Sequence, residues 1–98
     1  MSRGGRSRAA QEDIIAIWEH IARDNAPAAD RLVRKIDEMV RRLAAHPLIG
    51  SSQDKFRNGL RSFPVGKYVI FYELIADGIT VVRILHGARD WGKVILEE

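Results

Sequence analysis

The sequence predicts an α+β fold, in which an antiparallel helical hairpin packs on a small, mostly antiparallel sheet of three to four strands. Up to residue 45, apolar residues recur every three or four positions, as in amphipathic helices. From residue 60 onward apolar residues alternate with polar ones or follow one another directly, as in strands. The chain has 98 residues, 46% of them apolar, which suffices for one hydrophobic core. We therefore expect a single domain over residues 1–98.

The first eight residues, MSRGGRSR, contain two adjacent glycines and no apolar alternation. They predict a flexible basic arm, with a weak first strand at a sheet edge as the alternative. Ser7 is a candidate N-cap for the helix that follows.

Residues 9–45 carry the helical pattern. A first helix is predicted over about residues 9–23, and a second over about residues 27–45, where Pro27 fits the first turn. Asp24 and Asn25 form a short polar turn between them, so the two helices run antiparallel. The apolar stripes are Ile14, Ile17, Trp18 and Ile21 in the first helix and Ala29, Leu32, Val33, Ile36, Val40 and Leu43 in the second.

The charged residues argue against a phosphate-binding face. The net charge is +3, but Arg3, Arg6 and Arg8 lie in the first eight residues, and without them thirteen basic residues face thirteen acidic ones. Along the second helix, acids precede arginines by four positions, the favourable order for ion pairs. We expect this face to neutralise itself, and we expect no direct nucleic-acid binding. The predicted pairs are Asp30–Arg34, Asp37–Arg41 and Glu38–Arg42.

The second half of the chain predicts strands over residues 60–86. Residues 49–58 are expected to be a loop, and residues 60–65 a strand whose Pro64 favours a sheet edge or a bulge. Residues 68–75 form the strongest predicted strand, and Asp77-Gly78 is a favoured two-residue hairpin turn before the last strand, residues 79–86.

This turn predicts a register. On one face it pairs Leu74 with Val81, Tyr72 with Arg83 and Ile70 with Leu85, and on the other Glu73 with Val82, Phe71 with Ile84 and Val69 with His86. Both faces are largely apolar, although an antiparallel sheet usually leaves one face to water. Two helices cover one face only. The C-terminal tail, residues 91–98, or another chain is therefore expected to cover the second.

The stretch RILHGARDW, residues 83–91, gathers several polar residue types at the end of a strand. It fits three interpretations: an active site, a docking surface for a partner, or a capped strand end. Arg83 is expected in mid-sheet, where a guanidinium needs a carboxylate or carbonyl partner. Arg61, at the start of its strand, is expected near the same end of the sheet. Arginine, histidine and tryptophan suit phosphate chemistry or a protein interface.

Other chemistry finds no support in the residue pattern. There is no cysteine, no phosphate-binding glycine loop and no HExxH motif, and His20, His46 and His86 lie on different elements. We expect no metal site and no cofactor. A reducing, cytoplasmic location fits the absence of cysteine, and no apolar run is long enough to span a membrane.

Four segments in order resemble the ParE branch of the RelE/ParE toxin superfamily: DIIAIWEHIARDNAPAADRLVRKI, LAAHPLIG, GLRSFPVGKYVIFY and VVRILHGARD. The similarity extends over about residues 10–90. It implies the toxin half of a bacterial type II toxin–antitoxin pair, associated with plasmid stabilization, and a hetero-oligomer with a ParD-like antitoxin. It implies DNA gyrase as the target, inhibited by binding.

The resemblance also suggests site residues. Candidates for binding the target are Arg61, Arg83, His86, Arg89, Asp90 and Trp91, and candidates for binding the antitoxin are Trp18, Val69, Phe71 and Ile84.

The related RelE-type toxins, which cut messenger RNA on the ribosome, are the alternative. Those enzymes carry an arginine where this chain has Val69, and a tyrosine near the C-terminus, whereas no tyrosine follows Tyr72 here. Arg89 does match a nuclease-family arginine. Because two catalytic features are missing, we expect no catalytic residues and inhibition by binding.

Overall fold

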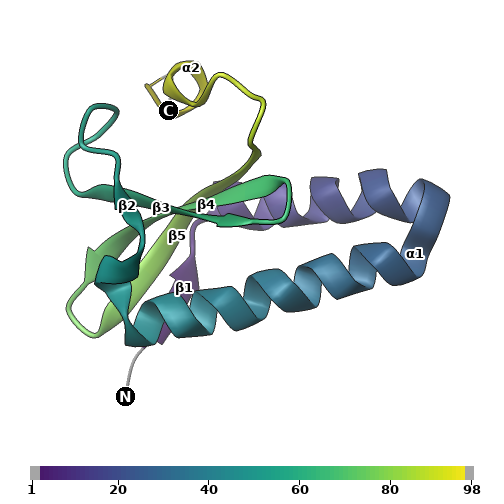
Figure 1. Cartoon of the computed structure of the whole chain (residues 1–98), viewed down its shortest axis with the longest axis horizontal. Coiled ribbons are helices and arrows are strands. Elements are labelled where there is room, and N and C mark those ends of the chain that lie inside the picture. The colour runs from purple at the N-terminus through teal and green to yellow at the C-terminus, as the bar shows by residue number, and fades with distance from the viewer. Residues whose placement is uncertain (1–2, 97–98) are drawn as a thin grey trace.

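The computed structural model describes residues 3–96, which form a five-stranded sheet with a long helix on one face and a short helix on the other (Figure 1). The strand order is β1-β5-β4-β3-β2, antiparallel except for the parallel pair of β1 with β5. This confirms the predicted α+β class, with five strands instead of three to four. The elements are β1 (Arg3–Arg6), α1 (Arg8–Ala45), η1 (Pro47–Ile49), β2 (Ser51–Ser52), β3 (Leu60–Val65), β4 (Tyr68–Ile75), β5 (Gly78–His86) and α2 (Trp91–Leu96).

The helix α1 is a hairpin of two arms, as Figure 1 shows. The arms, residues 8–24 and 26–45, meet at Asn25, whose φ of −158° and ψ of 88° are not helical. Asn25 caps the second arm, because its Oδ1 accepts the N–H of Ala28 at 3.0 Å. At the start of the first arm the Ser7 hydroxyl oxygen accepts the N–H of Ala10 at 3.0 Å. The predicted hairpin and the predicted Ser7 cap are both present.

The larger core lies between α1 and the sheet. Both arms bury their apolar stripes there, and Ile36, Leu43 and Tyr72 are fully enclosed. Trp18 departs from the prediction. It was placed on the apolar stripe, but its side chain is 39% exposed and its indole N–H donates to Asp30 Oδ1 at 2.8 Å, which ties the two arms together.

The basic first residues form a strand despite their composition. Residues 3–6 pair in parallel with Gly78–Val81 of β5. Glycine is required at position 4, because a Cβ there would lie 2.7 Å from Val40 Cγ1 on α1. The weak edge strand, and not the flexible arm, is thus the correct alternative for residues 3–6, while residues 1 and 2 lie outside the described part.

The predicted hairpin register is wrong. Ile75 pairs with Gly78, so the two turn residues are Ala76 and Asp77 and the pairing starts one residue earlier on each strand. A bulge at Val82 then shifts the pairing, with Tyr72 opposite Val81 but Phe71 opposite Arg83. As a result Ile84 points to the α1 side and joins that core, instead of facing Phe71 on the opposite side.

The second apolar face is covered by the chain itself. Ile95 of α2 is 2% exposed and packs with Leu60, Val69, Phe71, Val82 and Leu85. Of the two predicted covers, the C-terminal tail is the one present, at least through residue 96. The remainder of the tail, residues 97–98, lies outside the described part.

Residues 49–58 are not only a loop, because Ser51 and Ser52 pair with Ser62 and Arg61 as the edge strand β2. The backbone carbonyl of Leu60 points toward β2, where it accepts the N–H of Gln53 at 2.8 Å. Because backbone groups alternate along a strand, the backbone of Pro64 points to the same side, beyond the end of β2. Proline has no N–H to leave unpaired there. The predicted edge position of Pro64 is confirmed.

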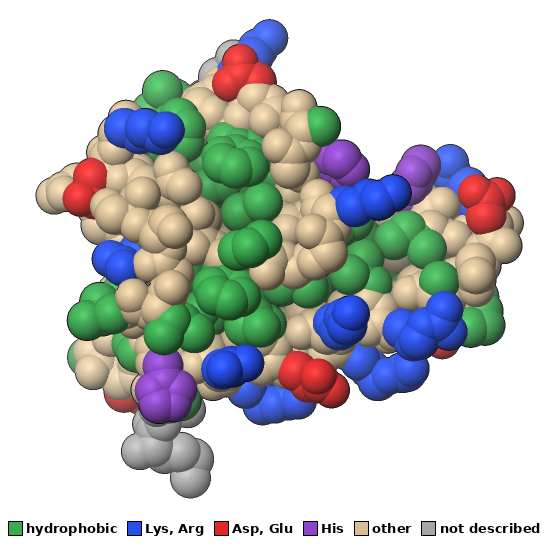
Figure 2. Space-filling view, viewed as in Figure 1, with side chains coloured by type: hydrophobic (Ala, Val, Ile, Leu, Met, Phe, Trp, Pro, Cys, Tyr) green, Lys and Arg blue, Asp and Glu red, His purple; other side chains and the backbone are tan. Residues whose placement is uncertain are grey.

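The outer face of the second arm does not neutralise itself as predicted. Asp30 is engaged by Trp18, and Asp37 forms an ion pair with Arg6 of β1. None of the three predicted i,i+4 pairs forms within residues 3–96; the i,i+4 pair present there is Arg8–Glu12, on the first arm. Lys and Arg side chains therefore remain exposed along this arm, at the lower edge of Figure 2.

Candidate functional site

The strand-end segment around His86 is a compact turn between β5 and α2. His86 closes it through three contacts: its Nδ1 accepts the N–H of Ala88 at 3.0 Å, and its carbonyl accepts the Arg89 N–H at 3.0 Å and the Trp91 indole N–H at 3.3 Å. The imidazole also packs edge-on against Tyr68, with ring centroids 5.3 Å apart. Nδ1 is thus an acceptor in this arrangement, and the ring is held on two sides.

The residues after His86 position α2. Asp90 caps this helix, because its Oδ1 accepts the N–H of Lys93 at 3.2 Å. Trp91 packs edge-on against Phe71 of β4, with centroids 5.3 Å apart. Asp90 and Trp91 therefore have the structural roles of the capped-strand-end interpretation, and α2 is held over the second face.

Arg89 differs from its neighbours. Its backbone N–H bonds within the turn, but its exposed side chain forms no hydrogen bond or ion pair with any residue in the described part of the chain. The turn thus presents one cation to solvent from a backbone held by His86 and Asp90.

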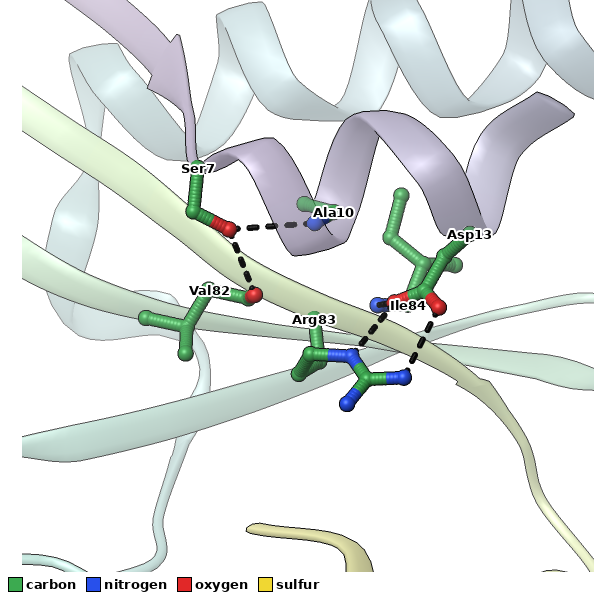
Figure 3. A network of polar contacts seen from close by, with 6 residues as sticks. All are labelled: Ser7, Ala10, Asp13, Val82, Arg83 and Ile84. Atoms are coloured by element: carbon green, nitrogen blue, oxygen red, sulfur yellow. Dashed lines mark hydrogen bonds and ion pairs between the residues drawn. The ribbon is translucent and has the colours of Figure 1, made fainter. Parts of the chain in front are cut away.

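Arg83 forms an ion pair with Asp13, the kind of carboxylate partner that its position in the sheet requires. Its Nε and Nη2 donate to the two carboxylate oxygens of Asp13 at 2.7 and 2.9 Å, a bidentate pair in which both side chains are about one-sixth exposed or less (Figure 3). Asp13 Oδ2 also accepts the N–H of Ile84 at 2.9 Å. The pair fixes the start of α1 to β5, and Arg83 is not part of an open binding surface.

The same network closes the edge of β5 beyond β1. The Ser7 hydroxyl donates to the Val82 carbonyl at 2.8 Å, next to the Asp13 contact with Ile84 (Figure 3). Two side chains thus take the place of a neighbouring strand at the bulge. Asp13 was not predicted as this partner, because it lies off the apolar stripe and nothing in its sequence neighbourhood singles it out. The prediction that Arg83 needs a carboxylate nevertheless required one such residue.

Arg61 does not lie near the strand-end turn. On β4, Arg61 lies opposite Tyr72, whereas His86 lies opposite Tyr68. Four residues separate Tyr68 from Tyr72, so Arg61 lies about 13 Å along the sheet from His86. Its Nη2 donates to the carbonyls of Leu48 and Gly50 at 3.0 and 2.5 Å. The expectation that Arg61 joins the cluster is wrong, and its role here is to hold the loop between α1 and β2.

Tyr72 is a structural residue that the sequence analysis missed. Its hydroxyl donates to the Pro47 carbonyl at 2.6 Å and accepts the N–H of Gly50 at 3.0 Å. A Cβ on Gly50 would lie 2.3 Å from this hydroxyl. The available signal was the tyrosine in a buried strand together with the sequence HPLIG, whose glycine and proline mark a tight turn.

The antitoxin candidates lie in three different places. Val69 and Phe71 are buried under α2, and Ile84 is buried under α1, so none of them presents a free side chain in this structure. Trp18 remains accessible, next to Ile15, which is 49% exposed.

The chain is thus a small α+β domain in which Asp13, Arg61 and Arg83 bond within the fold, while Arg89 is exposed on the turn after β5. Residues 6–91 match the family described as "ParE toxin of type II toxin-antitoxin system, parDE". The chain belongs to this ParE toxin family, as the sequence resemblance predicted.

Named relatives agree. "Toxin ParE1" of Mycobacterium tuberculosis (strain ATCC 25618 / H37Rv) is 35% identical over 86 residues, covering 86% of this chain and 88% of the relative. "Toxin ParE3" of Caulobacter vibrioides is 28% identical over 88 residues, covering 89% and 88%. The fold resembles a chain of the "Chromosomal ParDE TA system from P. aeruginosa", with a TM-score of 0.73 and 22% identity, covering 88% of this chain and 96% of that one.

Within residues 3–96 no three His, Asp or Glu side chains converge as a metal site would require. No helix in that range has the length and apolar content to cross a membrane.

Proposed function

We propose that this ParE toxin inhibits DNA gyrase by binding, through the turn after β5 and the adjoining surface of α2. The observation that carries the proposal is Arg89, a cation without a partner in the described chain on a turn held by His86 and Asp90. A side chain presented from a fixed backbone loses little conformational freedom on binding, and arginine is frequent among the residues that dominate interfaces.

The proposed mechanism needs no catalytic residue. The position where RelE-type nucleases have an arginine is Val69, which is buried under α2. The guanidinium groups of Arg61 and Arg83 bond within the chain, to carbonyls and to Asp13. The nearest imidazole, that of His86, accepts the Ala88 N–H through Nδ1 and packs edge-on against Tyr68, so it is engaged in holding the turn, and this favours binding over cleavage.

A supercoiling assay with purified gyrase tests this proposal. We expect the folded chain to inhibit supercoiling, and Arg89→Ala to require about tenfold more protein, which is about 1.4 kcal/mol of lost binding. Arg8→Ala is the matched control, since it removes an exposed arginine from the first turn of α1. Normal supercoiling at saturating wild-type protein would refute the proposal, and new ribosome-dependent cuts in messenger RNA would favour the nuclease alternative.

We also propose that a ParD-like antitoxin binds the first arm of α1 around Trp18 and Ile15. These are large apolar side chains exposed side by side, one helical turn apart. Val69 and Phe71 become accessible only if α2 moves away, and Ile84 only if α1 does.

Trp18→Ala should weaken antitoxin binding about 30-fold, since buried tryptophans are typical interface hot spots. Trp18→Phe keeps an aromatic ring but loses the N–H that bonds Asp30, and it separates the interface role from the role in joining the arms. If both variants bind as the wild type does, by calorimetry, the antitoxin does not use this surface.

A further inference from the structure

The two arms of α1 differ in charge. The first arm, residues 8–24, carries two arginines and four acidic residues, whereas the second, residues 26–45, carries five cations and three acidic residues. All five cations of the second arm are exposed, and together they define the basic face: Arg31, Arg34, Lys35, Arg41 and Arg42. At 3.6 residues per turn these positions fall within about 120° of the helix circumference. They lie opposite the buried stripe of Ile36, Val40 and Leu43, so the positive charge is gathered on the outer side of one arm.

The acidic residues of the second arm do not neutralise the basic face. Asp37 forms an ion pair with Arg6 of β1, and Asp30 accepts the indole N–H of Trp18 from the first arm. Within residues 3–96 the five cations form no ion pair, and Figure 2 shows part of their row along its lower edge. The expectation of no direct nucleic-acid binding depended on neutralisation of this face, and the structure removes that support.

The composition of the basic face favours phosphate over protein as its partner. Within residues 26–45 no large apolar side chain is exposed, whereas the first arm exposes Ile15 and Trp18. Protein interfaces usually have an apolar or aromatic centre. A face of long cations alone suits the backbone of a nucleic acid, where charge supplies much of the affinity and base sequence is not read.

The spacing of the cations fits a DNA duplex. Arg34 and Arg41 are seven residues apart, which is about 10.5 Å along the helix axis. The major groove of duplex DNA is about 12 Å wide, so the two guanidinium groups can reach phosphates on both sides of it.

We propose that the basic face contacts the sugar–phosphate backbone of the duplex DNA that gyrase holds, while the turn after β5 binds the enzyme. This inference rests on the proposed function and adds a contact with DNA to it. The helices α1 and α2 lie on opposite faces of the sheet (Figure 1), so both surfaces can be occupied at the same time. The cations alone would bind free duplex weakly, with Kd of about 10⁻⁴–10⁻⁶ M. A toxin already bound to gyrase meets the DNA at a high effective concentration, which makes the weak contact count.

The test measures the affinity of the full-length chain for purified gyrase with and without a linear DNA duplex, over a range of salt concentrations. For the wild type, DNA should tighten binding. The variant Arg34→Gln/Arg41→Gln should bind gyrase alone as the wild type does, but should bind the gyrase–DNA complex about tenfold more weakly or worse at about 0.1 M salt. With DNA present, the slope of log Kd against log salt should fall by about 1.8, since each lost phosphate contact accounts for about 0.9. Duplexes of unrelated sequence should give the same result, because phosphate contacts carry no sequence information.

Three further variants serve as controls. Arg8→Gln/Arg23→Gln removes the same charge from the first arm and should change both affinities less than twofold. Glu38→Gln removes the exposed acid within the basic face and should tighten binding to the gyrase–DNA complex about two- to threefold. Arg89→Ala should weaken binding with and without DNA alike, and so leave the gain from DNA unchanged. Thermal unfolding checks that all variants fold.

The outcomes separate this inference from the proposed function. If the wild type binds gyrase neither with nor without DNA, both fall. If it binds but DNA adds no affinity, or if Arg34→Gln/Arg41→Gln keeps the full gain from DNA, only this inference falls. If that variant loses the same affinity for gyrase alone, the basic face contacts an acidic protein surface, and the DNA contact is overturned.

Discussion

The two faces of the sheet are covered in unequal ways. The α1 face is closed by two helical arms, joined to each other through Trp18 and Asp30 and to the sheet through Asp13 and Arg83. The α2 face is closed by a helix of six residues, of which Ile95 is buried and Trp91 packs edge-on against Phe71. We therefore expect the α1 face to be the more stable core, and α2 to be a cover that can detach while the rest of the fold stays intact. Proposed target contacts lie beside the weaker cover.

The largest effect is expected in the α1 core. Ile36→Ala should lower the free energy of unfolding by about 3–4 kcal/mol, because a fully buried side chain leaves a cavity that two packed arms cannot close. Urea unfolding followed by circular dichroism measures this. A loss below about 1 kcal/mol would mean that the two arms move toward the sheet and close the cavity. The α1 face would then be packed no more rigidly than the α2 face.

The next effect concerns the link between α1 and β5. Asp13→Ala should lower stability by about 2–3 kcal/mol, since it leaves the largely buried Arg83 without its carboxylate and the Ile84 N–H without its acceptor. The double variant Asp13→Ala/Arg83→Ala should lose less than the sum of the single changes. Additive losses would show that the two side chains act independently. The Asp13–Arg83 pair would then not explain why the α1 face is more stable than the α2 face.

This link also explains what the sequence did and did not predict. The helical hairpin, the three strands between residues 60 and 86 and the edge position of Pro64 follow from periodicity and turn chemistry, which are local. The bulge at Val82 does not, because it accompanies side-chain bonds from Ser7 and Asp13, residues about 70 positions away in the chain. A register derived from the turn alone was therefore wrong, and with it the side of the sheet on which Ile84 lies.

The first strand was hard to predict for a similar reason. Residues 3–6 have no β-branched or aromatic side chain, and their pairing depends on β5 beside them and on the fit of Gly4 beneath Val40. At the candidate site, residue type predicted that Arg83 would need a carboxylate, but not which one. For Arg61, residue type did not predict the loop carbonyls that it bonds. The partners of long polar side chains depend on which residues the tertiary structure brings near them.

A smaller effect is expected on the α2 face. Ile95→Ala should lower the free energy of global unfolding by about 1–2 kcal/mol, less than Ile36→Ala, although both side chains are buried. If the short helix detaches while the α1 face stays folded, the loss cannot exceed the free energy with which α2 docks on the sheet. In amide hydrogen exchange, the free energy of opening should equal that of global unfolding for amides in α1 and should be lower for amides in α2. Equal losses for the two substitutions would show that α2 is as firmly held as α1.

The smallest effect lies in the loop that carries Phe56 beneath α2. The N–H of Gly59, a glycine with φ of 84°, donates to Asp54 Oδ1 at 2.8 Å, and this bond, followed by the Ser52 hydroxyl, lowers the pKa of Asp54 below its ordinary value. A lowered pKa in the folded chain means that the ionised carboxylate stabilises the loop. This contribution is complete above the pKa of the unfolded chain and disappears as the pH falls through the lower, folded value. Carboxyl NMR titration should give Asp54 a pKa below the ordinary value of an aspartate, and Ser52→Ala should raise this pKa part of the way back. Because Phe56 packs on the α2-side core, acidification should loosen that face first, whereas simultaneous loss of both faces would contradict their independence.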